Sequence, residues 1–177
     1  MRRLRTTFVG FLFIICTGMQ THAQGIEWKT LNDEAMSLYR QGRYDRAVEL
    51  ARKALEVAEQ EFGPDHPSVA TTLNTLAMLY RALGQYAEAE PLDKRSLAIR
   101  EKALGPDHPD VAQSLNSLGE VCSAQSQYTR AERLYRRALA IKEKALGLDH
   151  PDVAQTLNSL GKLYVSLGQY AEAKPLY

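Results

Sequence analysis

Apolar and small residues recur along this chain with the spacing of paired helices. Within 63–104, one set of apolar positions follows the i, i+3, i+4, i+7 pattern of a single helix face: Leu73, Leu76, Ala77 and Tyr80. A second apolar pattern runs from Tyr86 to Leu104. No segment alternates between apolar and polar residues as a half-buried strand does. The pattern therefore predicts an all-α fold built from pairs of helices.

These helix pairs repeat every 42 residues. Asp65-His66-Pro67 returns as Asp107-His108-Pro109 and again as Asp149-His150-Pro151. More than half of the positions are identical between 63–104 and 105–146. The register predicts four units, which are a first, divergent helix pair at 24–62, full repeats at 63–104 and 105–146, and an incomplete repeat at 147–177.

Proline, glycine and small residues define each expected pair. Pro67 and its repeats suit the first helical position, where no N–H is needed. Gly84 permits the left-handed turn that ends a helix, whereas the third unit has Ser126 at that place. Ala77 and its equivalents, Ala35, Gly119 and Gly161, allow close helix contact. Because one pair cannot bury its apolar face alone, the units are expected to stack as an α-solenoid.

The first 23 residues have the parts of a secretory signal peptide. Arg2, Arg3 and Arg5 precede an apolar run of about a dozen residues, which is shorter than the roughly 20 that a membrane-spanning helix needs. Cleavage is expected after Ala23, which makes the protein exported, periplasmic or secreted. Two alternatives remain: an uncleaved anchor, or a lipoprotein acylated at Cys16, although Ile15 is bulky for the position before such a cysteine.

Charge and cysteine content narrow the classes of function. The formal net charge of +1 becomes −2 without the three leader arginines, so no electrostatic case exists for nucleic acid, and the membrane is involved only through the leader. Cys122 is then the single cysteine.

No hydrolase or phosphate-loop motif is present, so we expect no catalysis and no cofactor. We also expect no metal, because successive repeated histidines lie roughly 10 Å apart, and each is expected to cap a helix.

The segment 73–89 resembles the tetratricopeptide repeat. It reads Leu-Asn-x-Leu-Ala-x-Leu-Tyr-x-x-x-Gly-x-Tyr-x-x-Ala. The 42-residue period and the Gly-Pro-Asp-His-Pro linker are similar to the kinesin light chain variety, and the resemblance covers about 26–177. It implies a right-handed superhelix whose concave face receives peptides. Motor attachment is not implied, because a leader stands where a kinesin light chain has its coiled coil.

Beside its apolar face, the first helix of each unit has a second stripe of residues. The resemblance places this stripe in the concave groove. An asparagine recurs in that stripe, and its amide can both donate to and accept from a peptide backbone. The predicted peptide-binding residues are Asn32, Met36, Tyr39, Arg40, Asn74, Met78, Arg81, Asn116, Glu120, Asn158 and Lys162. The alternative interpretation is that the asparagines only mark a family consensus or bond to neighbouring helices. The mixed charge of the stripe favours acidic ligands slightly.

Three functional hypotheses follow. The leading one is a non-catalytic scaffold for protein or peptide partners whose identity the sequence does not name. The second is a recruiting N-terminal array of a longer exported enzyme or signalling protein, with its catalytic domain beyond Tyr177. The third is self-association through the uncapped C-terminal repeat. The sequence also predicts that 84–130 is the least stable repeat, since Ser126, Asp93 and Cys122 all depart from the consensus there.

Overall fold

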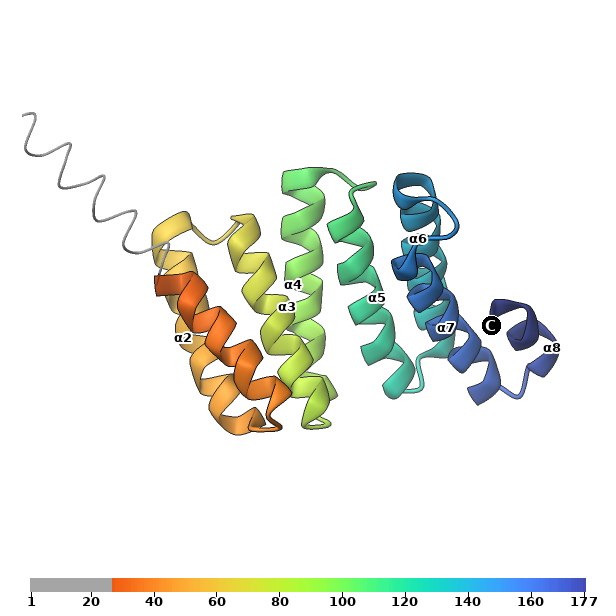
Figure 1. The fold of residues 1–177 in the computed structure, drawn as a ribbon, viewed down its shortest axis with the longest axis horizontal. Coiled ribbons are helices and arrows are strands. Elements are labelled where there is room, and N and C mark those ends of the chain that lie inside the picture. The colour runs from red at the N-terminus through yellow and green to blue at the C-terminus, as the bar shows by residue number, and fades with distance from the viewer. Residues whose placement is uncertain (1–26) are drawn as a thin grey trace, which may run out of the picture.

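The protein is a row of stacked helix pairs (Figure 1). The computed structural model describes residues 27–177, so the expected leader at 1–23 and its cleavage site lie outside the described residues. Residues 27–40 form the first helix and pair with α2 (Tyr44–Phe62). The pairs that follow are α3 (Pro67–Ala82) with α4 (Tyr86–Leu104), α5 (Pro109–Ala124) with α6 (Tyr128–Leu146), and α7 (Pro151–Ser166) with the short α8 (Tyr170–Ala173). A 3₁₀ turn at Lys174–Leu176 follows.

The stacking confirms the predicted right-handed solenoid of antiparallel helix pairs. Helix α4 packs against α3 of its own unit and against α5 of the next, and α6 does the same with α5 and α7. Consecutive first helices also touch, α3 with α5 and α5 with α7. No strand occurs among residues 27–177. The core is therefore divided among several clusters along the stack rather than gathered at a single centre.

The helix ends lie where proline and glycine predicted them. Helices α3, α5 and α7 begin at a proline, and the histidine before each proline accepts a hydrogen bond from the backbone two residues on, at 3.1–3.2 Å from Nδ1. The capping role of these histidines is thus confirmed. Ser126 adopts φ 62° in the place of Gly84, which has φ 74°. That left-handed conformation costs an L-residue about 1 kcal/mol.

Close approach between the two helices of a pair depends on the small residue on the first helix. The ring of Tyr135 on α6 lies directly over Gly119 on α5, and Tyr177 lies over Gly161 in the same way. In the second unit, Ala77 replaces the glycine and Asp93 replaces the tyrosine. The smaller partner on α4 makes room for the methyl group of Ala77, so the two positions change together from unit to unit.

A hydrogen bond joins an arginine on the second helix of one unit to a tyrosine on the first helix of the next. It occurs at the first and third joints between units but not at the middle one. Arg136 on α6 donates to the Tyr164 hydroxyl at 2.9 Å, and Arg52 on α2 donates to the Tyr80 hydroxyl. At the middle joint, where the second unit packs against the third, the equivalent residues are Lys94 and Cys122. Cys122 is a fully buried free thiol. That joint therefore lacks the bridge that its neighbours have.

Candidate functional site

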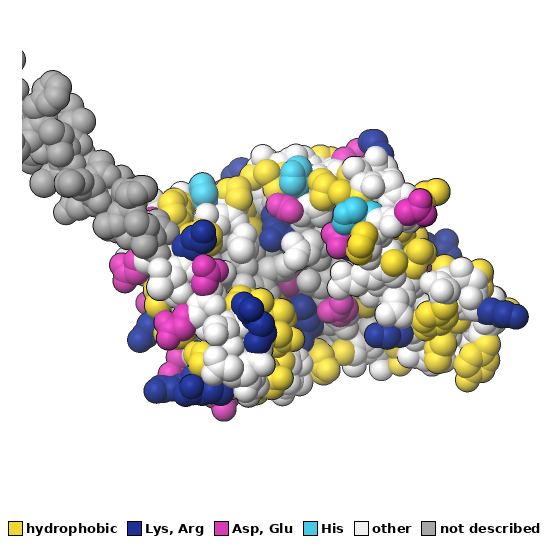
Figure 2. Space-filling model, in the orientation of Figure 1, with side chains coloured by type: hydrophobic (Ala, Val, Ile, Leu, Met, Phe, Trp, Pro, Cys, Tyr) yellow, Lys and Arg dark blue, Asp and Glu magenta, His cyan; other side chains and the backbone are white. Residues whose placement is uncertain are grey.

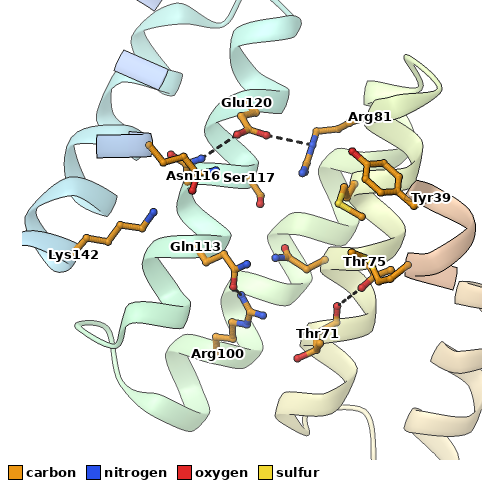
Figure 3. A pocket seen from close by; sticks show the side chains of 14 residues that line it. Tyr39, Thr71, Thr75, Arg81, Arg100, Gln113, Asn116, Ser117, Glu120 and Lys142 are labelled. Atoms are coloured by element: carbon orange, nitrogen blue, oxygen red, sulfur yellow. Dashed lines mark hydrogen bonds and ion pairs between the residues drawn. The ribbon is translucent and has the colours of Figure 1, made fainter. Parts of the chain in front are cut away.

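One groove of about 450 Å³ runs along the first helices of all four units (Figure 3). We call it the inner groove. It lies across the face of the molecule shown in Figure 2, and the histidine side chains are spaced along one edge of that face. The residues that line the inner groove are Met36, Tyr39, Thr71, Asn74, Thr75, Met78, Arg81, Arg100, Gln113, Asn116, Ser117, Glu120, Lys142 and Gln155.

Seven of the eleven residues predicted to bind peptide line this groove, and four do not. The seven are Met36, Tyr39, Asn74, Met78, Arg81, Asn116 and Glu120. Arg40 is exposed and its Nε donates to the Met36 carbonyl, so it turns along its own helix. Asn158 lines a separate depression with Leu157 and Tyr177, and neither Asn32 nor Lys162 reaches the inner groove. The predicted site is thus concentrated on the second and third units. That these residues bind a peptide stays a prediction.

The recurring asparagines carry unpaired acceptors. The Oδ1 atoms of Asn32, Asn74 and Asn116 are buried and accept no hydrogen bond from residues 27–177. Asn116 uses its amide nitrogen to donate to Glu120 Oε1 at 3.0 Å. A buried acceptor without a donor is costly, by roughly 1–3 kcal/mol. A ligand N–H that reaches Asn74 or Asn116 would supply the missing donor.

Two buried cations from the second helices reach the floor of the groove, and neither was predicted from the sequence. Arg100 on α4 donates to the Asp110 carbonyl and to Ser114 Oγ, both at 2.9 Å. Lys142, one repeat later on α6, donates to the Asp152 carbonyl at 3.1 Å and to Thr156 Oγ1 at 2.9 Å. The pattern held a signal, because a basic residue follows an isoleucine at the same place in both repeats. The predicted groove contained first-helix residues only.

All the hydrogen-bond partners of these two cations are neutral groups. Both side chains are 5% exposed, and neither forms an ion pair with a carboxylate of residues 27–177. Burial lowers the pKa of Arg100 and of Lys142, as expected for a charge moved out of water. At the first joint the equivalent residue is Ala58, and there the Thr72 hydroxyl accepts instead from Trp28 Nε1 at 2.7 Å. The net charge of the groove floor is therefore positive on the second and third units.

One of the residues that depart from the repeat consensus is a carboxylate that is fully buried beside the groove. Asp93 on α4 is 0% exposed, and its Oδ2 pairs with Arg81 Nη1 at 2.8 Å. Arg81 Nε also lies 3.6 Å from Glu120 Oε2. Burial raises the pKa of Asp93 to about 7, although Arg81 opposes this. The charge of Asp93 is thus coupled to a predicted site residue.

Two further kinds of site were sought in the described part of the chain. No cluster of three or more histidine, cysteine or acidic side chains could hold a metal among residues 27–177. Within the same range, no helix combines the length and the apolar character that crossing a bilayer requires.

Comparison with known proteins agrees with this geometry. A sequence model of the tetratricopeptide repeat matches residues 29–102, 68–144 and 118–177. No curated protein sequence matches the chain. Among solved structures, BtubC (BKLC) from P. vanneervenii has a TM-score of 0.77 at 28% identity, over 86% of this chain and 61% of that one. This chain therefore spans less than two thirds of BtubC.

A second solved structure carries the same repeat type. It is a kinesin light chain-type protein of Podosopora anserina with nearly identical TPR-like repeats, and it matches with a TM-score of 0.75 at 29% identity, over 84% of this chain and 70% of its own. A point variant of that protein matches equally well. The tetratricopeptide repeat is typical of scaffolds without enzymatic activity. The chain belongs to the tetratricopeptide repeat family, with repeats of the kinesin light chain type.

Proposed function

We propose that this protein is a non-catalytic scaffold that binds an extended peptide segment of a partner protein along the inner groove. Repeats of this family generally mediate protein–protein interaction. The observation that carries the proposal is the pair Asn74 and Asn116, which line the same groove one repeat apart and each keep a buried Oδ1 without a donor. Peptide N–H groups along an extended backbone would satisfy such acceptors without requiring particular side chains.

The ligand that best fits the floor is acidic. Arg100 and Lys142 are buried positive charges whose hydrogen-bond partners are all neutral, and a buried charge gains most when an opposite charge enters its low-dielectric surroundings. Glu120 is the one acidic residue in the groove lining, and Arg81 already lies beside it. Met36, Tyr39 and Met78 supply adaptable apolar contact at the other end of the groove.

A peptide-display selection on the purified chain tests the proposal. The selected pool, measured by fluorescence anisotropy, is expected to bind the parent chain and to lose about tenfold or more in affinity with Asn74→Ala plus Asn116→Ala, the loss of two hydrogen bonds. Asn158→Ala is the matched control, because that asparagine is exposed and lies outside the inner groove. Acidic residues are expected to be enriched in the pool relative to the starting library.

Three outcomes would count against the proposal: a pool that binds the double variant as tightly as the parent, a selection that enriches nothing, or a double variant that no longer shows the helical dichroism and the urea midpoint of the parent. The last would make the asparagines structural.

We further propose that the scaffold works in the periplasm or outside the cell, on the strength of the basic and apolar leader at 1–23. Expression of the full chain in a bacterium, followed by fractionation and mass determination, tests this. A released chain beginning at Gln24 supports it, and an intact chain in the cytoplasmic fraction contradicts it.

A further inference from the structure

Among residues 27–177, Asp93 is the only acidic residue that is completely buried. It lies on α4 at the position that Tyr135 and Tyr177 occupy in the next two units, so the repeat architecture does not require a carboxylate there. Its Oδ2 pairs with Arg81 at 2.8 Å, whereas its Oδ1 is buried and has no hydrogen-bond partner in the described chain. Ionised Asp93 is therefore stabilised by one contact and penalised by burial.

Arg81 connects this buried acid to the inner groove. Its Nη1 pairs with Asp93. Its Nε faces Glu120 at 3.6 Å, and Glu120 in turn accepts from the Asn116 amide at 3.0 Å (Figure 3). Arg81 and Glu120 are also departures from the repeat: the third and fourth units have Ser123 and Val165 in place of Arg81, and the second and fourth have Met78 and Lys162 in place of Glu120. Three unusual residues thus meet at one joint.

The surroundings of Asp93 set the balance between its two protonation states. Arg81 faces it from α3, Glu120 and Cys122 approach from α5, and Arg100 lies on its own helix. Its helix neighbours Glu90 and Lys94 pair with each other, and Glu90 also pairs with Arg130 from α6. Burial and Glu120 raise the pKa of Asp93, and Arg81 and Arg100 lower it, with the result near 7.

We infer that Asp93 controls the charge that Arg81 presents to the inner groove. Ionised Asp93 holds the guanidinium on the α4 side. When a proton from solvent is added to Asp93, the attraction for Arg81 falls, and the guanidinium moves toward Glu120 and any acidic group in the groove. The groove then gains one positive charge as the solution becomes more acidic. This consequence for ligands rests on the proposed function, whereas the release of Arg81 is a property of the chain alone.

The release is tested without any ligand. In carbon-detected NMR of the full chain, one aspartate carboxyl is expected to titrate near pH 7 and to disappear in Asp93→Asn, with the Arg81 Nε resonance following the same midpoint. Asp65 and Asp107 are internal references, because lysine bonds hold the pKa of each below its usual value. Titration of Asp93 near pH 4, or an Arg81 resonance that does not move with it, would overturn the inference.

The consequence for binding is tested with hexaglutamate, and with hexaglutamine as the uncharged control. Hexaglutamate is expected to bind about fivefold more tightly at pH 6 than at pH 8, a modest coupling between sites. Asp93→Asn and Arg81→Gln are each expected to remove this pH dependence. Equal affinity at both pH values, together with a normal NMR result, would show that Arg81 does not act on the groove. A failure of hexaglutamate to bind at any pH would count against the acidic ligand of the proposed function and leave the NMR result to decide the release.

Discussion

The ring of Tyr135 lies against the bare Cα of Gly119, so closely that a Cβ on Gly119 would be 2.6 Å from ring carbon Cε1. Tyr135 is 3% exposed and cannot move aside without disturbing the joint between α5 and α6. Gly119→Ala is therefore expected to destabilise the fold by about 1–2 kcal/mol, because overpacking exceeds the gain in helix propensity. Urea unfolding followed by dichroism measures the change.

Gly161→Ala is the matched control for that variant. The ring over Gly161 belongs to Tyr177, which is 71% exposed and free to swing outward. We expect a change in unfolding free energy of less than about 0.5 kcal/mol there. Equal losses in the two variants would mean that close packing of the ring is not the cause.

Stability should depend on pH through Asp93. The pKa of its carboxyl is about 7 in the folded chain, against an ordinary value of 3.8. Between these values the folded state binds more protons than the unfolded state, so the contribution of Asp93 to stability is lost as the pH rises from about 4 to 7 and stays lost above that. Asp93→Asn removes this loss and is expected to be more stable than the parent at pH 8. Urea midpoints of the two chains from pH 4 to pH 8 give the difference, and a midpoint difference that does not grow with pH would contradict the argument.

The joint between α4 and α5 depends on Arg100. Arg100→Ala removes the side-chain donor to the Asp110 carbonyl and to Ser114 Oγ and is expected to cost about 2–3 kcal/mol. Arg100→Lys should cost less than about 1 kcal/mol, because Lys142 makes the equivalent pair of bonds at the next joint. The unfolding free energies of the two variants check this, and equal losses would show that the position requires a guanidinium.

Ser126 is strained in a conformation that suits glycine. Ser126→Gly is expected to stabilise the chain by up to about 1 kcal/mol, because glycine adopts φ 62° without strain. Gly84→Ser at the equivalent turn, where φ is 74°, should destabilise it by a similar amount. Thermal unfolding of both variants measures the two shifts, and changes of the same sign would rule out backbone strain as their cause.

The segment 84–130 is predicted to open most readily among the repeats. The strained turn at Ser126 and the missing bridge between Lys94 and Cys122 both lie in it. Hydrogen exchange is expected to be faster there than in the equivalent amides of 63–83 and 131–146. If 84–130 exchanges most slowly, the polar contacts of Arg100 and Arg81 outweigh these local defects.

The sequence predicted the first-helix side of the candidate site but not the second-helix side. Asn74, Met78 and Arg81 follow from helical periodicity, because the apolar stripe fixes which residues point away from the core. Arg100 and Lys142 do not follow from it, since a long side chain can leave its own helix and end beneath the next one. Asn32, Asn158 and Lys162 share a repeat position with groove residues but do not line the groove, and Arg40 lies one position past the residue equivalent to Arg81.

By itself, the sequence determined the elements and their stacking: local rules of periodicity, proline and glycine act over a few residues, and the 42-residue repeat applies them to every unit. Only the tertiary structure decided which side chains meet across a joint. The burial of Asp93, its contact with Arg81 and the reach of Arg100 depend on distances between helices that no local rule specifies. Because those distances determine how burial and neighbouring charges act on each group, the charge of the groove could not be predicted from the sequence.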